Sequence, residues 1–588
     1  MESISQRLQV VAHADLSTTL FTAALVGLLS HIPIRSYEFE RVVLQFLAGC
    51  VLCFLELGGL YVYTGQCGSL YAALARSLLI QAVFHASLLA SIAVYRLGFH
   101  RCRHIPGPVG AKLSRFYVVY LASKKVQFHK ELLQMHEKYG DFVRTGPREV
   151  SVFRKAAVNA ILGPNSKCRK STWYSQFGFD PTKVSLHLCR DHIMHRRRRR
   201  AWDRGLSIKA LATYVPRIKS HADLLSQRLR ERSGRPVDAT QWAMFFGFDM
   251  IGDVGYGRSF DQLVDLAEHP AVLPIHEHII ELGILGNVPW FSHLLSFVPG
   301  GAAALAATFD FCQNQRRTKQ KTWSNDEYPR DIVSWLLKAM SEHNGTGPPS
   351  IAALDDDTRL LLLAGSETTS SALSNALFFL ARYPEKQEKL RAALLLPLPK
   401  SSDTTTASSA AAAAANWSYE AVLGVKYLDH FISETLRLKP SLFLSGRYET
   451  PPEGMQVDEV RIPGRVVVTA PLVWLQRDPR YWQRPDEFLP ERWGGRPPSG
   501  DGDGCTIDVS HTSANGLGEF PLKIGAFSCP GKNLALMTLR IALSVILQNF
   551  KVDFAPGETG VEFDNEAKDT FTTTLPPLKL QFTQLQAG

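Results

Sequence analysis

One segment of the chain reads Leu522-Lys523-Ile524-Gly525-Ala526-Phe527-Ser528-Cys529-Pro530-Gly531-Lys532-Asn533-Leu534-Ala535, with a cysteine between two glycines. Pro530 suits the first turn of a helix, because its missing N–H would be unsatisfied there anyway. The run from Leu534 to Leu547 is apolar on almost every side, which is typical of a buried helix. The segment therefore predicts a sulfur held at the N-terminus of a buried helix.

The position of Cys529 favours a thiolate. Unpaired backbone N–H groups and the positive end of the helix dipole lie at a helix N-terminus and stabilise negative charge. Gly525 and Gly531 let the backbone approach a large flat ligand without Cβ clashes. A thiolate held in this way suits an axial ligand of haem iron. The alternative is a buried cysteine that packs as a small hydrophobic side chain.

A second motif, Ala364-Gly365-Ser366-Glu367-Thr368-Thr369, lies inside a helical stretch that runs roughly from Ile351 to Ala381. Gly365 and the hydroxyl-rich residues after it weaken the middle of this helix, and such irregularities often mark functional sites. There, the hydroxyl of Thr368 and the carboxylate of Glu367 can relay protons to bound oxygen. The alternative is a threonine that only bonds the carbonyl one turn back along its own helix.

Two further motifs supply candidates for a buried ionic network. In Glu434-Thr435-Leu436-Arg437 the acid and the arginine are three residues apart and share a helix face. Arg492, in the loop Phe488-Leu489-Pro490-Glu491-Arg492-Trp493, provides a third charge. If buried and fully hydrogen-bonded, a Glu434–Arg437–Arg492 network specifies structure more than it adds stability. A chance surface pair, which is worth little, is the alternative.

The order Thr368, Glu434–Arg437, Arg492, Cys529 resembles that of the cytochrome P450 (haem-thiolate monooxygenase) family, from roughly Ile105 to the C-terminus. The resemblance implies a mainly α fold with a small β-rich lobe. It also implies haem b on the Cys529 thiolate, proton delivery by Thr368 and Glu367, and O2 activated with NADPH-derived electrons. The rival reading is an enzyme of the same fold that rearranges or dehydrates a substrate without a reductase, but such members commonly lack the helix threonine.

The chain departs from the family pattern near the cysteine. The residue two before it, usually a cation that binds a haem propionate, is Phe527, and the position seven before it, usually Phe, is Leu522. Because Phe527 cannot donate a hydrogen bond, other groups must hold the propionates. The candidates are Arg447, together with Arg199 and His195 on a basic helix that resembles the family's W-x-x-x-R segment. Most of the arginines from Arg196 to Arg200 are expected to be solvated.

Residues 1–104 are expected to anchor the chain in a membrane. Three apolar segments, 16–34, 42–63 and 77–97, are each about 20 residues long, enough to cross about 30 Å of hydrocarbon. Basic residues that include Arg96, Arg101 and Arg103 follow the third segment, and such a cluster marks the cytosolic side. The sequence therefore predicts an endoplasmic-reticulum membrane protein with a cytosolic catalytic domain at 105–588, and leaves open one span or three.

Other features narrow the function. The low-complexity segment 399–416 is expected to be a surface insert in the catalytic domain. Nine cysteines without paired C-x-x-C spacing argue against a disulfide framework and against zinc. The net charge of +10 suits docking of an acidic flavin domain of NADPH–cytochrome P450 reductase, with cytochrome b5 as a second candidate donor. Nucleic acid is not expected, since no aromatic–basic interleaving accompanies the charge.

The substrate class follows from analogy. Trp173-Tyr174 and Phe177 fall where the family's first substrate loop lies, and Phe571-Thr572-Thr573-Thr574 fall near its last. They suggest an apolar pocket with a few hydroxyls, although core packing explains each aromatic residue equally well. The anchor and the segment Gly163-Pro164-Asn165-Ser166 look similar to fungal members that oxidise secondary metabolites, including indole alkaloids. The expected substrate is therefore an apolar small molecule.

Overall fold

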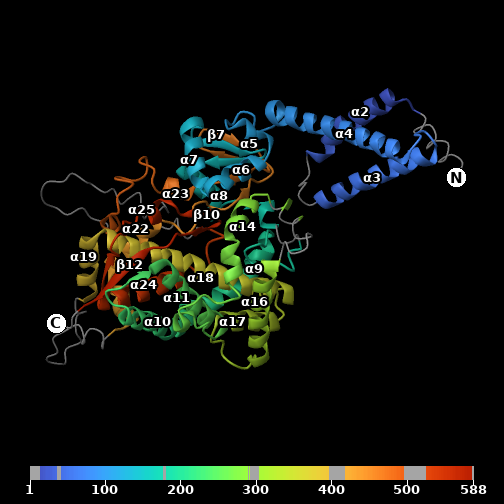
Figure 1. Ribbon diagram of the computed structural model, residues 1–588. Coiled ribbons are helices and arrows are strands. Elements are labelled where there is room, and N and C mark those ends of the chain that lie inside the picture. Colours follow the sequence, from blue (N-terminus) through green and yellow to red (C-terminus); the bar gives the residue numbers. More distant parts are fainter. Residues whose placement is uncertain are drawn as a thin grey trace, which may run out of the picture.

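The computed structural model describes residues 14–35, 42–175, 180–288, 290–291, 294, 303–395, 417–494 and 525–585. The predicted fold class is confirmed: a large helical body carries a smaller β-rich lobe, and three N-terminal helices project away from both (Figure 1). The expected surface insert 399–416 lies outside the described residues, as do Leu522 and Phe177.

The β-rich lobe is built on a five-stranded sheet with the order β1-β2-β8-β5-β3. Its strands are Phe142–Gly146, Glu149–Val152, Val467–Thr469, Tyr448–Glu449 and Arg169–Lys170, respectively. β1 runs antiparallel to β2, and β2 runs parallel to β8. Apolar residues of this sheet pack against helix α8 (Lys155–Leu162). The sheet thereby places Lys170 and Tyr448 at the border with the helical body.

Three small sheets complete the β structure. β6 (Met455–Val457) pairs with β7 (Val460–Ile462), and β10 (Lys568–Thr570) pairs with β11 (Thr572–Thr574). The third has the order β4-β12-β9, with strands Pro236–Asp238, Lys579–Gln584 and Phe550–Phe554. The turn between β10 and β11 holds Phe571 at a φ of 85°, a left-handed conformation that is unusual for a bulky residue.

Helices make up most of the catalytic body, and the structure sets their bounds as follows: α5 Val109–Leu113, α6 Phe116–Lys125, α7 Phe128–Tyr139, α9 His192–Gly205, α10 Ile208–Glu231, α11 Ala239–Tyr256, α12 Gln262–Asp265, α13 Leu273–Glu277, α14 Ile279–Leu285, α16 Ala303–Thr322, α17 Ile332–Ser341, α18 Ile351–Arg382, α19 Pro384–Leu395, α21 Tyr419–Gly424, α22 Lys426–Leu438, α23 Leu472–Leu475, α24 Lys532–Asn549 and α25 Val561–Asn565. Short 3₁₀ turns occur at Thr172–Ser175 and Pro490–Trp493.

The long helix α18 crosses the core of the body and packs against α11 and α24 (Figure 1). It remains α-helical through the weakened segment around Gly365, so the expected irregularity does not interrupt it. A Cβ at Gly365 would collide with Ile251 of α11, so this glycine permits the two helices to approach closely. Tertiary packing therefore outweighs the local weakness of the sequence.

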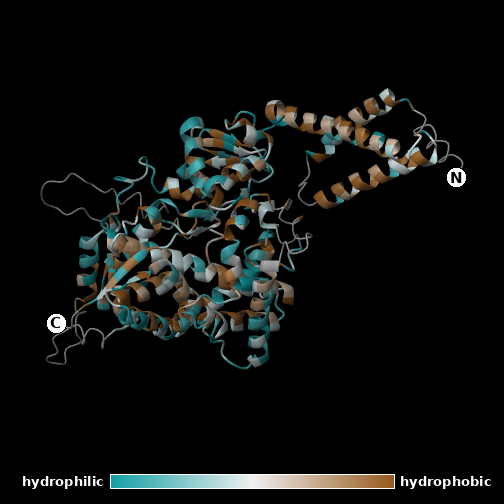
Figure 2. Ribbon diagram, viewed as in Figure 1, coloured by the Kyte–Doolittle hydropathy of each residue, from teal (hydrophilic) through white to brown (hydrophobic). Residues whose placement is uncertain are grey.

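Three apolar helices at the N-terminus are long enough to cross a membrane: α2 (Leu16–Ile34), α3 (Val43–Tyr63) and α4 (Leu70–Val94), which continues to Phe99 as a π-helix. They stand out as largely hydrophobic in Figure 2. The third begins at Leu70, before the predicted start at residue 77, because the Ser69 hydroxyl caps it by accepting a hydrogen bond from the Ala72 N–H at 3.2 Å. α4 packs against both α2 and α3.

Candidate active site

Cys529 lies in a short loop that immediately precedes α24. The helix starts at Lys532, with Gly531 as its N-cap residue, so Pro530 stands just outside it. The helix is buried along most of its length, as its apolar sequence predicts. A Cβ built on Gly531 would come 3.9 Å from the Cys529 sulfur, whereas Gly525 has a φ of 79° and lies against the backbone of Leu162 and Gly163. Of the two glycines, Gly531 is therefore the one beside the thiol.

The cysteine loop forms one wall of a central cavity of about 240 Å³. The opposite wall is the middle of α18, which contributes Ala364, Gly365, Thr368 and Thr369. Apolar residues of α24 such as Leu534 line it as well, and Phe571 reaches it from the turn between β10 and β11. The cavity is mainly apolar, so it suits a flat hydrophobic ligand together with an apolar substrate.

On the α18 wall, Thr368 lines the cavity, whereas Glu367 beside it does not. The Thr368 hydroxyl donates to the Ala364 carbonyl at 2.8 Å, so it makes the intrahelical bond that was the alternative reading of this residue. The same oxygen keeps lone pairs that can accept a hydrogen bond from a donor in the cavity. Glu367 Oε2 accepts a hydrogen bond from the Thr572 hydroxyl at 3.0 Å.

His276 of α13 links Glu367 to a second acid. Its Nε2 lies 3.8 Å from Glu367 Oε1, and its Nδ1 pairs with Glu268. Burial disfavours the imidazolium, but the hydrogen bond to Glu268 and the charges of both carboxylates outweigh it and raise the pKa of His276 to about 9. Sequence reasoning missed this histidine, because nothing in the local pattern places it beside α18. The result is a chain of ionisable groups that ends next to Thr368.

Basic side chains gather at one end of the cavity. Lys170, His195 and Arg199 line it around Phe527. The Lys170 ammonium lies 4.8 Å from the centre of the Phe527 ring, and the His195 ring meets that ring edge-on at 4.8 Å. Arg199 donates to the Ser528 carbonyl and to Asp203, each at 2.7 Å. The sequence could not place Lys170 here, because it sits in a two-residue strand without a recognisable pattern.

The electrostatics of this end favour an anion. Burial, together with the nearby positive charges of Lys170 and Arg199, lowers the pKa of His195 to about 2, so the ring is neutral. Among the residues that the structure describes, no aspartate or glutamate lines the central cavity. Asp203, which pairs with Arg199, does not line the cavity, so the described side chains that line the cationic end include no carboxylate.

Arg447 does not line the central cavity. It borders a smaller neighbouring one of about 70 Å³, where its Nη2 donates to Asn287 Oδ1. Its Nη1 is buried and has no hydrogen-bond partner within the described part of the chain. The next residue along β5, Tyr448, lines the central cavity instead.

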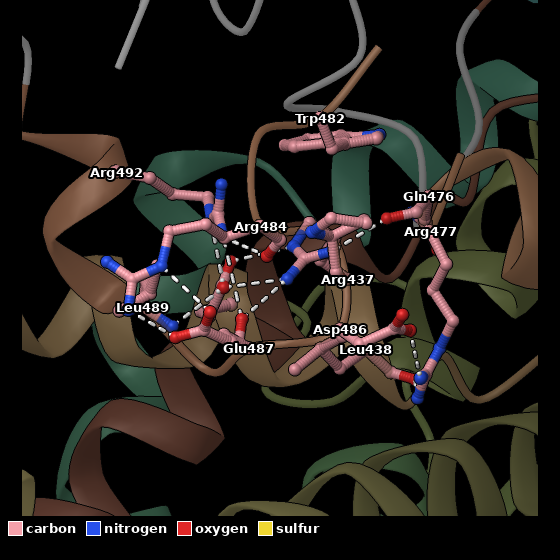
Figure 3. Close-up of polar contacts among 12 residues, drawn as sticks. Arg437, Leu438, Gln476, Arg477, Trp482, Arg484, Asp486, Glu487, Leu489 and Arg492 are labelled. Carbon is pink, nitrogen blue, oxygen red and sulfur yellow. Dashed lines mark hydrogen bonds and ion pairs between the residues drawn. The ribbon is translucent and has the colours of Figure 1, made fainter. Parts of the chain in front are cut away.

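The structure brings Glu434, Arg437 and Arg492 together in a buried network. Figure 3 labels Arg437 and Arg492 of this network, with polar contacts to the surrounding loop. Glu434 accepts from Arg437 at 2.8 and 2.9 Å and from Arg492 at 2.9 Å. The Leu489 N–H and the Trp493 indole add two more donors, at 2.9 and 3.0 Å. All three charged side chains are at most 2% exposed, so this is not a surface pair. The buried network connects α22 to the loop that precedes the cysteine segment in the sequence.

The cavity residues fit a haem, which family membership would imply. Trp202 lines the cavity, and its indole N–H is buried and has no acceptor among the described residues. With Lys170 and Arg199 it provides donors for the two carboxylates of a haem at the end where the protein supplies none. Trp202 lies three residues after Arg199 and so on the same helix face, a signal that the sequence contained. The apolar walls and the Cys529 thiol match the remainder of such a group.

An apolar cavity with a thiol on one wall and hydroxyls on the other has the architecture of a haem-thiolate protein. Comparison with known proteins narrows this class: residues 107–582 match the cytochrome P450 family, and the chain belongs to that family.

Its relatives are fungal enzymes. The chain is 32% identical over 564 residues to the cytochrome P450 monooxygenase FCK2 of Fusarium pseudograminearum, covering 95% of this chain and 96% of that one. It is 33% identical over 511 residues to a cytochrome P450 monooxygenase, orf5, of Eupenicillium brefeldianum, covering 85% of this chain and 95% of that one. It is 31% identical over 575 residues to the tryprostatin B 6-hydroxylase of Aspergillus fumigatus, covering 96% of each. The predicted enzyme class, a cytochrome P450 monooxygenase that uses haem and O2, is confirmed.

Proposed function

We propose that this chain is a membrane-anchored monooxygenase that hydroxylates an apolar secondary metabolite with electrons from NADPH–cytochrome P450 reductase, cytochrome b5 serving as a second donor. The observation that carries the proposal is the apolar cavity that Cys529 and Thr368 line from opposite walls. When bound, a haem would supply the oxygen-activating chemistry, and the Cys529 thiolate would hold its iron.

The residues around the cavity have distinct tasks in this proposal. Lys170, Arg199 and the Trp202 indole hold the haem carboxylates, with neutral His195 as a further donor. Arg447 joins them if its guanidinium turns from Asn287, since its Nη1 is buried without a partner among the described residues. The apolar walls exclude water from the reacting substrate.

Proton delivery is assigned to α18. Glu367 exchanges protons with His276, which is 23% exposed and therefore in reach of solvent. Thr368 holds a proton at its Oγ1 on the cavity side and receives its replacement from Glu367, either directly after a rotamer change or through water.

The anchor and the substrate complete the proposal. The three apolar helices hold the catalytic domain at the cytosolic face of the endoplasmic reticulum, since Arg101 and Arg103 follow the last of them. Two of the relatives are named tryprostatin B 6-hydroxylase, which favours an indole-containing substrate. Phe571, at the tip of its turn, offers an aromatic surface on which a flat ring can stack.

The proposal is tested with Cys529→Ser. The reduced wild-type protein is expected to show the carbon monoxide difference band of a thiolate-ligated haem, and the variant to lack both this band and product formation. A variant that keeps the band would contradict the role of Cys529. NADPH-dependent oxygen uptake with the reductase separates monooxygenation from the rival rearrangement, which consumes no oxygen.

A further inference from the structure

A second cavity, of about 300 Å³, shares no lining residue with the central one. It lies where the C-terminal end of α18, the end of α22 and the segment after α25 meet α7. Figure 3 shows part of its wall, where Arg477 contacts Asp486 and the Leu438 carbonyl. Its lining is as much polar as apolar, unlike that of the central cavity.

Positive charge dominates this second cavity. Four basic side chains, Lys130, Arg382, Lys439 and Arg477, face two carboxylates, Asp486 and Asp564. Lys439 is 8% exposed and pairs with Asp564 at 2.6 Å, and Arg477 pairs with Asp486 at 3.0 Å. Arg382 is exposed at the cavity and has no charged partner among the described residues. Two basic groups therefore remain without a neutralising acid.

The pKa values of one buried histidine and one buried lysine reflect this positive charge. Burial, together with the neighbouring charges of Lys130 and Arg477, lowers the pKa of His129 to about 3. The pKa of Lys439 is lowered by burial, which its ion pair opposes, and again by Arg477 and Arg382. An anion in the cavity would relieve both effects.

The cavity also presents hydrogen-bonding atoms that lack partners. His129 Nδ1, Asn375 Oδ1 and Arg477 Nε are buried and have none within the described part of the chain. His129 and Asn375 are themselves 4% and 1% exposed. Asn375 Oδ1 can only accept, and Arg477 Nε can only donate. A carboxylate ion cannot satisfy this set, because it has no hydrogen to donate, whereas an oxyanion with a hydroxyl group can.

We propose that this second cavity binds a small oxyanion that carries a hydroxyl group, of the hydrogen-phosphate type, between Lys439, Arg382 and Asn375. The anion receives hydrogen bonds from the basic side chains and from Arg477 Nε, and its hydroxyl donates to Asn375 Oδ1. Pro440 borders this cavity, and the next residue, Ser441, borders the central one. An occupant of the second cavity would therefore stiffen the chain segment that separates the two cavities. A free phosphate and a lipid headgroup share this chemistry.

The test measures binding of inorganic phosphate to the full-length, haem-loaded protein in nanodiscs of neutral lipid, by equilibrium dialysis with radiolabelled phosphate at an ionic strength held constant with chloride. We expect one saturable site per chain. Arg382→Gln, an exposed change, is expected to weaken binding by about tenfold or more, because a hydrogen bond to a charged group is lost. Lys439→Met should weaken it at least as much. The matched control is Lys426→Gln, exposed and away from the cavity, which should bind normally.

Three outcomes would overturn the proposal. The first is the absence of saturable binding, which would mean that the cavity holds only water. The second is unchanged binding in both Arg382→Gln and Lys439→Met. The third is an equal loss of binding in Lys426→Gln, which would indicate general attraction of phosphate to a basic protein. Nanodiscs that contain phosphatidic acid distinguish the two sources of the anion. Displacement of phosphate by that lipid assigns the site to a headgroup, and unaltered binding assigns it to a free phosphate.

Discussion

Replacing Arg437 by methionine tests whether the buried network sustains the fold around the cysteine loop. The guanidinium makes five hydrogen bonds: two to Glu434, and one each to the carbonyls of Gln476, Pro485 and Glu487. The methionine fills a similar volume but donates none of them. Glu434 then keeps only Arg492, Trp493 and the Leu489 N–H as partners.

The expected loss is about 3–5 kcal/mol of the free energy of unfolding, the cost of removing one partner from a buried pair. The Gln476 and Pro485 carbonyls lose this donor, whereas the Glu487 carbonyl keeps a hydrogen bond from Arg492 at 3.5 Å. Each orphaned carbonyl adds a penalty of about 1–3 kcal/mol if it stays dry, but water entering the gap satisfies part of this demand. Since proteins are stable by only about 5–15 kcal/mol, the change removes a large share of the total. Arg437→Lys keeps the charge but loses the fork geometry of the guanidinium. Its free energy of unfolding should therefore fall between those of the wild type and Arg437→Met.

The assay compares denaturant midpoints by tryptophan fluorescence, together with the haem-to-protein ratio after purification. Trp482 lies 5.1 Å from the Arg437 guanidinium carbon and reports on the region directly. The control is Arg484→Met, which breaks an exposed ion pair with Glu487 in the same loop and should shift the midpoint little. Equal midpoints for Arg437→Met and Arg484→Met would refute the structural role of the network.

Three further predictions concern the site. Thr368→Ala should retain haem and substrate binding but divert NADPH-derived electrons to peroxide; product formed per NADPH at the wild-type level would remove this hydroxyl from proton delivery. Arg199→Ala should lower haem affinity by about one to two decades, the worth of a charged hydrogen bond, while exposed Arg196→Ala leaves the haem-to-protein ratio unchanged. The pKa of His276 is raised from 6.5 to about 9, so its stabilising contribution is complete below pH 6.5 and lost as pH rises through 9. The melting-temperature advantage of wild type over His276→Gln should shrink across that interval, and a constant gap would contradict the pairing with its two carboxylates.

Local spacing accounts for what the sequence predicts well. Glu434 and Arg437 share a face of α22 because residues three apart always do, and Cys529 precedes α24 because the apolar run after it makes a buried helix. The three apolar N-terminal segments were likewise recognisable, since their length and composition leave few other structures open. In each case a few consecutive residues contain the information.

Contacts between distant segments explain what the sequence could not give. The direction of the Arg447 side chain depends on Asn287, which lies far away in the chain and follows α14. The close approach of α18 to α11 at Gly365 depends on Ile251, a residue more than a hundred positions away in the chain. His276 reaches Glu367 only because the fold brings the two side chains together from α13 and α18, and no periodic pattern announces such a contact.

Phe527 shows how one departure from a family pattern can be absorbed by its surroundings. The ring cannot donate a hydrogen bond, yet it lies under the Lys170 ammonium at 4.8 Å and beside the rings of His195 and Tyr448. An aromatic face attracts a cation and costs little to desolvate, so the ring steadies a lysine that already donates to the His187 carbonyl at 2.6 Å. In our proposal, the positive charge that the family pattern leads us to expect on the cysteine loop is supplied by Lys170 from the β-rich lobe. In our proposal, Phe527 orients the cation that holds the haem instead of providing it.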